Sequence, residues 1–167
     1  MPPAIAEADL YRYAFPWRWR PGPLRVYVGL NPSTMTALKT DHTGRKWKGF
    51  CDRDGFGGYI AINCFSFRAT DQSELVTAGE DGVDLIGPLG DELFQAMLGH
   101  PHATEIMVCW GNSPDKRLTP RLDAIAALVT NPECHQHPVR CFGMTQQRQP
   151  RHPLMLSYAT PLEAFRP

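Results

Sequence analysis

Polar or small residues follow four apolar segments of the sequence, at the points where those segments end. They are Asn31-Pro32-Ser33, Asn63 with Phe65, Gly111-Asn112, and Arg151-His152-Pro153. The needs of a hydrophobic core would not select residues of these types. Taken singly, each group is also ordinary turn chemistry, because Asn, Pro, Gly and Ser are the usual turn residues. Their recurrence at four segment ends favours a binding site lined by amide, hydroxyl and imidazole groups.

Asp41 is a further candidate for this site, because a carboxylate can activate water as a general base. The residues after it are His42-Thr43-Gly44, and a helix is expected over residues 45–54. Asp41 is equally suited to cap that helix, since its carboxylate can accept hydrogen bonds from the first N–H groups. Both roles stay open at this point.

The four apolar segments predict β-strands, and the amphipathic segments between them predict helices. Strands are expected over 24–30, 59–65, 105–110 and 139–142, and helices over 45–54, 88–98 and from Thr119-Pro120 onward. Strands that alternate with helices form parallel sheets with helices on both faces. The predicted fold class is therefore α/β, a three-layer α/β/α sandwich with a central four-stranded parallel sheet, in a single domain over residues 1–167. Ligands bind beyond the carboxyl ends of such strands, where the four polar groups fall.

The remaining segments carry weaker patterns. Residues 1–22 are expected to form an N-terminal arm, in which Arg and aromatic residues alternate from position 11. Such a stretch can stack on bases, but docking of the aromatic side chains on the core is favoured, with Arg18 and Arg20 exposed. Residues 66–86 are expected to be irregular, and the tail from Thr160 to form one helical turn. The side chains expected to face inward are Trp47, Phe50 and Cys51 in the first helix, Leu89, Leu93, Ala96 and Met97 in the second, and Leu118, Leu122, Ile125 and Val129 in the third.

The composition is that of an ordinary globular protein, with 43% hydrophobic and 20% charged residues among 167. No apolar run approaches the roughly 20 residues of a membrane span, and the first ten residues lack the features of a signal peptide. A soluble, cytoplasmic protein without a membrane partner is expected. The five cysteines include no Cys-x-x-Cys pair, and the cluster of Cys134, His135, His137 and Cys141 fits no standard metal spacing. Buried thiols, no metal and no organic cofactor are therefore expected.

The net charge is zero, but the charges are unevenly distributed along the chain. Residues 69–115 contain nine acidic residues and no Lys or Arg, so the rest of the chain holds all 17 basic residues. Thirteen of these are Arg, which binds phosphates through two donors and stacks on bases. A two-faced molecule of this kind is compatible with a nucleic acid on its basic side. An ordinary surface with one acidic stretch explains the same counts.

Several of these segments resemble motifs of a known enzyme superfamily. Val28-Gly29-Leu30-Asn31-Pro32-Ser33 resembles the first motif of the uracil-DNA glycosylase superfamily, and Arg151-His152-Pro153-Leu154 resembles its second catalytic motif. Val108-Cys109-Trp110-Gly111-Asn112 is similar to its third-strand segment. Through Asp41-x-Thr43-x-Arg45, Asn63-x-Phe65 and Pro150-Arg151-His152-Pro153, the whole chain also resembles a largely uncharacterised family of small bacterial and phage proteins.

The glycosylase resemblance implies a fold, an activity and a set of roles. Its first motif is like that of the mismatch-specific branch, in which Asn31 would position the attacking water. Asn63 would bind the Watson–Crick edge of a flipped base, and His152 would hydrogen-bond the departing base. Further roles implied by position are base contacts from Ser33 and stacking by Phe65, a wedge into the duplex from Pro153 and Leu154, and DNA contacts from Arg45, Arg148 and Arg151. Ser33 stands where that branch has Gly, so the resemblance does not fix which base is bound.

The chemistry of such a reaction suits these residues. Hydrolysis of an N-glycosidic bond passes through a cationic sugar and an anionic base, so an amide can orient water without a strong base. A histidine donor that meets charge as it develops contributes about 3 kcal/mol to the transition state. A base in duplex DNA must first be flipped out, at a cost of a few kcal/mol, which a wedge and flanking Arg contacts could offset. The predicted function is therefore a DNA glycosylase-like hydrolase, with DNA as the expected partner.

Three alternatives use the same residues differently. A hydrolase or transferase of free nucleotides or nucleosides would not need Arg148, Arg151 or Leu154. A non-catalytic reader of modified bases would keep Asn63 and Phe65 but would not need Asn31. A scaffold protein would need none of these groups. The oligomeric state is not predicted.

Overall fold

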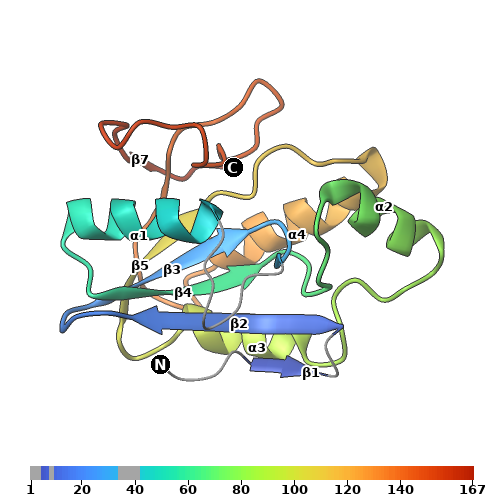
Figure 1. The fold of residues 1–167 in the computed structure, drawn as a ribbon, viewed down its shortest axis with the longest axis horizontal. Coiled ribbons are helices and arrows are strands. Elements are labelled where there is room, and N and C mark those ends of the chain that lie inside the picture. Colours follow the sequence, from blue (N-terminus) through green and yellow to red (C-terminus); the bar gives the residue numbers. More distant parts are fainter. Residues whose placement is uncertain (1–4, 8–9, 34–41) are drawn as a thin grey trace.

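The computed structural model describes residues 5–7, 10–33 and 42–167. In this part of the chain seven strands form one sheet, in the order β1-β2-β4-β3-β5-β6-β7 (Figure 1). The strands are β1 (Ile5–Glu7), β2 (Tyr11–Arg18), β3 (Leu24–Gly29), β4 (Gly58–Asn63), β5 (Ala103–Val108), β6 (Val139–Cys141) and β7 (Glu163–Ala164). The helices described are α1 (His42–Asp54), α2 (Gln72–Glu80), α3 (Gly90–Leu98) and α4 (Thr119–Val129), with a 3-10 turn, η1 (Lys116–Leu118), before α4.

The four strands predicted from the sequence are adjacent and parallel: β4 pairs with β3, β3 with β5, and β5 with β6. The sheet as a whole is mixed, however, which corrects the prediction of a four-stranded, all-parallel sheet. β2 pairs antiparallel with β4, β1 pairs antiparallel with β2, and β7 pairs antiparallel with β6. The α/β class is confirmed, with antiparallel strands added at both edges.

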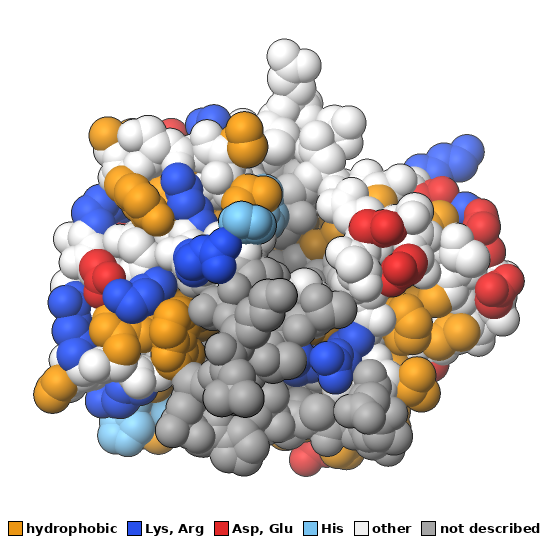
Figure 2. All heavy atoms as spheres, in the orientation of Figure 1, with side chains coloured by type: hydrophobic (Ala, Val, Ile, Leu, Met, Phe, Trp, Pro, Cys, Tyr) orange, Lys and Arg blue, Asp and Glu red, His pale blue; other side chains and the backbone are white. Residues whose placement is uncertain are grey.

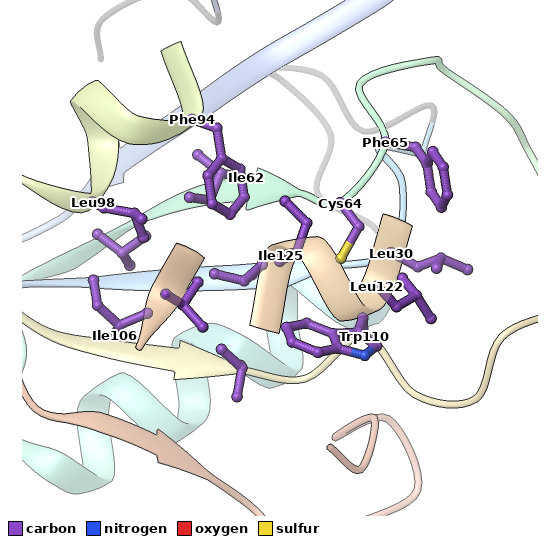
Figure 3. Packing of buried hydrophobic residues seen from close by; sticks show 14 of the residues in the cluster. Leu30, Ile62, Cys64, Phe65, Phe94, Leu98, Ile106, Trp110, Leu122 and Ile125 are labelled. Atoms are coloured by element: carbon purple, nitrogen blue, oxygen red, sulfur yellow. The ribbon is translucent and has the colours of Figure 1, made fainter. Parts of the chain in front are cut away.

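Helices cover both faces of the sheet. Successive side chains of a strand point to opposite faces, so each strand contributes to a buried cluster on either side. Val26 and Val28 of β3 join one buried cluster, which includes Leu75 of α2. Figure 3 shows residues that α3 and α4 contribute to it, among them Phe94 and Leu122. Tyr27, between Val26 and Val28, joins a second cluster on the other face, which α1 and the segment after His152 complete. All six residues of β3 and of β4 are buried, as is typical of parallel strands covered on both faces.

Three segments differ from the sequence prediction. The N-terminal arm is an integral strand, β2, although its aromatic side chains Tyr13 and Phe15 are buried as predicted and Arg18 and Arg20 are exposed. The irregular stretch 66–86 contains α2, which Asp71 caps by accepting from the N–H groups of Ser73 and Glu74. The tail forms β7 rather than a helical turn.

The buried faces of the helices agree with prediction in two helices and differ in one. Trp47, Phe50 and Cys51 of α1 are buried, as are Leu122, Ile125 and Val129 of α4, while Leu118 lies just before α4 and is half-buried. In α3 the buried residues are instead Gly90, Phe94 and Leu98, and Leu89 is exposed. The stripe at every fourth residue therefore faces the sheet, and the predicted inward face of α3 is wrong.

A buried arginine stabilises the edge of the sheet where the parallel strands begin, opposite the edge that carries the polar residues. Arg25, near the start of β3, is fully buried, and its Nε donates to Glu105 Oε1 at 2.8 Å. Its Nη2 donates to Asp54 Oδ2 at 2.7 Å, and its Nη1 to the Tyr27 hydroxyl at 3.3 Å. Two carboxylates and a hydroxyl thus compensate one buried cation, which ties α1 to β3 and β5.

The segment after His152 packs on α1. The Arg53 guanidinium donates to the carbonyl oxygens of Tyr158 and Thr160, and the Tyr158 ring meets Phe50 edge-on, with centroids 4.9 Å apart. The Lys46 ammonium lies 4.3 Å from the centre of the Tyr158 ring. None of the described helices has the length and apolar character to cross a membrane.

Candidate functional site

The largest group of the predicted site residues meets at a cavity of about 120 Å³ at the carboxyl edge of the parallel strands. β3 and β5 are neighbours in the sheet, but the chain continues from β3 to β4 on one side and from β5 to β6 on the other. A crevice is expected at the carboxyl ends of two neighbouring strands whose connections run in opposite directions. The described residues that line the cavity are Arg12, Phe15, Gly29, Leu30, Asn31, Pro32, Ser33, Thr43, Trp47, Ala61, Asn63, Gln72, Trp110 and His152.

Asn31 is held in place by the pairing of the segments that follow β3 and β4. The Phe65 N–H donates to the Leu30 carbonyl at 2.9 Å, and the Ala69 N–H to the Pro32 carbonyl at 3.2 Å. The Asn31 side-chain nitrogen donates to the carbonyls of Pro32 and Ala69, both at 3.2 Å. These bonds fix the amide plane without using its oxygen, which can therefore accept a hydrogen bond from a water molecule.

Asn63 ends β4, and its side chain is only 9% exposed. Within the described part of the chain its amide makes no hydrogen bond, although a buried amide normally has a partner. The side chain lines the cavity. An amide placed in this way offers a donor and an acceptor to a ligand and satisfies its own polar groups only when a ligand or water is bound.

His152 reaches the cavity from the loop after β6, which is anchored to the end of β5. The buried Trp110 donates from Nε1 to Gln149 Oε1 at 2.7 Å, and the Gly111 N–H donates to the Pro150 carbonyl at 2.9 Å. The Leu154 N–H donates to His152 Nδ1 at 3.2 Å. Since Nδ1 accepts, a neutral imidazole carries its proton on Nε2, which makes Nε2 a donor.

The two arginines of this loop lie outside the cavity lining. Residues 143–151 form a hairpin-like loop, in which Met144 bridges Pro150 and the Thr145 hydroxyl donates to Asn112 Oδ1 at 2.7 Å. Arg148 lies in the left-handed backbone region, with φ of 59°, and it is exposed. Arg151 is exposed. Both can contact a ligand only where it extends beyond the cavity.

Pro153 and Leu154, which were predicted to act together as a wedge, differ in their exposure to solvent. Pro153 is buried, and its carbonyl accepts from the Leu156 N–H at 3.0 Å, which closes a turn. Leu154 and Met155 form the tip of this turn and are 41% and 91% exposed. The exposed apolar tip therefore consists of Leu154 with Met155, a residue that the sequence analysis did not select.

The remaining predicted residues are placed as follows. Ser33 lines the cavity. Phe65 is 3% exposed and packs in the cluster that α4 covers, so its ring does not line the cavity (Figure 3). Arg45 is exposed in the first turns of α1, where its Nη2 lies 2.7 Å from His42 Nδ1. Asp41 lies outside the described residues.

Several lining residues were not selected from the sequence. Arg12 and Phe15 belong to β2, which was expected to be an arm, and Gln72 belongs to the unpredicted helix α2. Trp47 was assigned to the core face of α1, where it does stack on Tyr27 with centroids 4.9 Å apart, but it also borders the cavity. The alternation of Arg and aromatic residues over 11–20 was the one signal that pointed to Arg12.

The thiols near the site are poor nucleophiles. Burial raises the pKa of the Cys109 thiol to about 12, and burial also raises the pKa of Cys64 well above its ordinary value. Since the thiolate is the reactive form, these two cysteines act as small apolar residues. Among the described residues, no group of three His, Cys, Asp or Glu side chains is placed to hold a metal ion.

The surface around the site carries charge of both signs on separate elements. Figure 2 shows acidic side chains gathered over α2, and most basic ones over α1 and the C-terminal segment. The α1 helix contributes Arg45, Lys46, Lys48 and Arg53. The division follows the sequence, because the stretch without Lys or Arg includes α2 and α3.

The fold and the cavity define the class of protein, an α/β protein with a polar cavity at the carboxyl ends of its parallel strands. A family model described as "Protein of unknown function (DUF1643)" matches residues 12–154. Because the match covers most of the chain, the protein belongs to the DUF1643 family. All the described cavity-lining residues, from Arg12 to His152, fall inside the matched region. Searches of the curated proteins and of the solved structures found no match.

Proposed function

We propose that the protein is a DNA glycosylase-like enzyme, which hydrolyses the N-glycosidic bond of a damaged or modified base flipped out of DNA. The observation that carries this proposal is the meeting of Asn31, Asn63 and His152 at one cavity, from three segments far apart in the sequence. An amide that can orient water, a second amide that hydrogen-bonds to none of the described residues, and an imidazole donor are the groups that this reaction needs. The motif resemblance to uracil-DNA glycosylases supports the same assignment.

In the proposed mechanism Asn31 positions the attacking water. Its amide nitrogen is held by two carbonyl groups, so its oxygen accepts a hydrogen bond from the water and directs it toward the sugar. The sugar acquires cationic character as the bond to the base breaks, so a weakly activated water suffices. The water oxygen then bonds to the sugar carbon, and the base departs with the electron pair of the broken bond. The proton that the water loses ends on the base.

His152 and Asn63 act on the base. Nε2 of a neutral His152 donates to a base oxygen or nitrogen on which negative charge develops, and this interaction strengthens as the bond breaks. The donor and acceptor of the Asn63 amide, which bond to none of the described residues, bind the polar edge of a planar base. Phe15 and Trp47 border the same space. A base in a duplex cannot reach these groups, so it must first leave the stack.

The surface beside the cavity suits contact with a nucleic acid strand. Arg148 and Arg151 lie in the loop that positions His152, and Arg45 lies in the first turn of the basic helix α1. The exposed tip of Leu154 and Met155 follows directly after His152 and could fill the space left by a flipped base. The phosphate contacts would make binding weaken as the salt concentration rises.

The test is base release from DNA by the purified protein. Oligonucleotides that carry uracil, mismatched thymine, deaminated purines or hypermodified phage bases are incubated with the protein and treated with alkali to cleave abasic sites. Strand cleavage that falls about 100-fold or more in Asn31→Ala and His152→Ala is expected. Asn131→Ala and His137→Ala, two changes of the same types outside the cavity, serve as matched controls and should retain cleavage.

Two results contradict the proposal. Absence of cleavage on all of these substrates, together with salt-sensitive DNA binding that survives Asn31→Ala, indicates a non-catalytic reader of modified bases. Absence of both cleavage and DNA binding, with release of a base from free nucleosides or nucleotides, indicates a hydrolase of small molecules that uses the same cavity.

A further inference from the structure

We propose that a second cavity of the molecule, bordered by Arg18, His100 and His102, is a binding site for a dianionic phosphate group. This cavity has a volume of about 200 Å³, and none of its described lining residues belongs to the candidate functional site. The proposal goes beyond the proposed function and does not depend on it.

Two separate elements bring the three cationic side chains to this cavity. Arg18 is the last residue of β2 and pairs with Gly58 at the start of β4. His100 and His102 belong to the turn between α3 and β5. The Leu24 N–H donates to the His102 carbonyl at 2.9 Å, which anchors this turn at the start of β3, and α3 packs on β2 and β4. The cavity therefore lies where the parallel strands begin, at the opposite edge of the sheet from the candidate functional site.

The chain contains two His-x-His turns, and the contrast between them shows which imidazole is available to a ligand. In the first turn the His102 N–H donates to His100 Nδ1 at 3.2 Å. In the second the His137 N–H donates to His135 Nδ1 at 3.1 Å, in the same way. Nε2 of His135 lies 2.6 Å from the Val129 carbonyl, so the fold already uses it. Nε2 of His100 has no such partner among the described residues, and it can donate to a ligand even from a neutral ring.

The charges around His100 have one sign. Burial, followed by the positive charges of His102 and Arg18, lowers the pKa of His100. Tyr59 is the remaining titratable residue of the described lining, and its hydroxyl donates to the Gly44 carbonyl in α1, on the other face of the sheet. The described lining contains no carboxylate, and Arg18 makes no ion pair within the described part of the chain.

Like charges gathered in this way repel one another, and a bound anion removes the repulsion. An arginine and two protonated histidines balance a dianion, and the same arginine disfavours a metal ion at the histidine pair. Guanidinium and imidazolium groups form strong hydrogen bonds to phosphate oxygens.

The uncharged part of the lining indicates which phosphate compounds fit. Pro16, Leu24 and Ile60 border the same cavity and offer an apolar surface to the carbon group of a phosphate ester. A phosphodiester of a nucleic acid strand carries a single negative charge and would leave more of the positive charge unbalanced. The site is therefore assigned to a phosphomonoester or to free phosphate.

Titration of the histidines by NMR tests the site in the intact protein. Sulfate is the first probe, because it stays a dianion over the whole pH range in which histidine titrates, and sodium chloride keeps the ionic strength constant. Sulfate should raise the pKa of His100 by about 0.5–1 pH unit, since an anion stabilises the protonated ring. By linkage, the affinity for sulfate should rise about 3- to 10-fold as the pH falls through the same range. The pKa of His137, which burial and His135 lower, should stay unchanged and is the internal control.

Binding of phosphates to variants tests the role of the arginine. At about pH 6, where a large part of the histidine is protonated, Arg18→Gln should bind inorganic phosphate about 10-fold more weakly than the wild type. Arg18 is exposed, so the fold should persist, which circular dichroism checks. Arg166→Gln removes another exposed arginine and should bind phosphate as the wild type does. Tighter binding of phenyl phosphate than of inorganic phosphate identifies an ester as the ligand, and equal binding identifies free phosphate.

An unchanged pKa of His100 in sulfate would overturn the proposal, as would an equal rise in the pKa of His137. Undiminished phosphate binding by folded Arg18→Gln would overturn it as well. The same holds for tighter binding, in competition at this site, of an oligonucleotide without terminal phosphates than of phenyl phosphate. None of these measurements uses base release, so their outcome is independent of the glycosylase proposal.

Discussion

The Asn63 amide occupies space that any side chain at Gly29 would require. A β-carbon placed on Gly29 would lie 2.7 Å from Asn63 Oδ1 and 3.5 Å from two ring carbons of Trp47. Gly29 and Asn63 are also paired across the parallel strands β3 and β4. The glycine that ends β3 therefore makes room for the side chain that ends β4.

Gly29→Ala should consequently damage the cavity more than the fold. The added methyl group displaces the Asn63 side chain, so base release and binding of free bases are expected to fall at least tenfold. Urea denaturation should show a loss of no more than about 1–3 kcal/mol, the usual effect of one extra buried methyl group. Gly99→Ala is a matched control, because a β-carbon there meets nothing closer than 3.7 Å. A fully active Gly29→Ala would show that the position of Asn63 is not needed.

The bond between Trp110 and Gln149 should position His152 without touching the ligand. Gln149→Leu removes the acceptor of the buried Trp110 Nε1, so the loop that carries His152 becomes less constrained. We expect kcat for base release to fall about 10- to 100-fold, as small misplacements of reacting groups do, with little change in the affinity for DNA. Gln149→Glu keeps an acceptor at the same place and should rescue most of kcat. Parallel losses of kcat and DNA affinity would instead indicate a general loss of structure.

Gly49 in α1 permits the docking of the C-terminal segment. A β-carbon at Gly49 would overlap the ring of Tyr158, so Gly49→Ala should destabilise the protein by about 1–3 kcal/mol. In a Tyr158→Ala background the same change should stabilise it by about 0.5–1 kcal/mol, because Ala is a better helix former than Gly. Urea denaturation of the four proteins gives both values. The same sign in both backgrounds would contradict the observed packing.

The buried ion pairs of Arg25 should make the fold sensitive to acid. Burial alone raises the pKa of Asp54, but hydrogen bonds from Arg53 and Arg25 outweigh it, so the pKa lies below its ordinary value. A carboxyl group with a lowered pKa in the folded state stabilises the fold above the pKa of the unfolded chain, about 4, and this contribution is lost as the pH falls below it.

Denaturation of the wild-type protein and of Asp54→Asn between pH 3 and pH 6 measures this contribution. At pH 6 Asp54→Asn should be less stable by about 1–3 kcal/mol, because Arg25 loses one charged partner. The difference between the two proteins should shrink toward pH 3, since Asp54 becomes protonated in the unfolded wild-type chain before it does in the folded protein. A constant difference across this range would show that the pKa of Asp54 is not lowered by folding.

The parallel part of the sheet was predictable because its strands are short, apolar and followed by abrupt polar turns. The ends of all four parallel strands, β3, β4, β5 and β6, lie within two residues of the predicted ends. β2 was not recognised, since it contains Pro16 and alternates Arg with aromatic residues, a pattern suited to a strand near the edge of a sheet. The antiparallel strand that was missed is the one that brings Arg12 and Phe15 to the cavity.

Helix α2 and the buried face of α3 were not predicted from the sequence, for two different reasons. α2 has one fully buried residue, Leu75, so it carries almost no periodic signal, and only Asp71 followed by Glu74 marked its start. In α3 both stripes contain apolar residues, and packing against β2 and β4 selected Phe94 and Leu98. Phe65 follows its strand as predicted, but the pairing of β3 and β4 continues past it and its ring packs in the core.

The assembly of the cavity from strand ends far apart in the chain couples ligand binding to the stability of the whole molecule. An unfolded chain cannot present Asn31, Asn63 and His152 together, so a ligand of the cavity binds the native state alone. Such a ligand raises the free energy of unfolding by about 2.7 kcal/mol at 100 times its dissociation constant. The melting temperature of the protein is thus itself a sensor of cavity occupancy, and a library of bases, nucleosides and nucleotides can be ranked by thermal shift before any reaction has been observed.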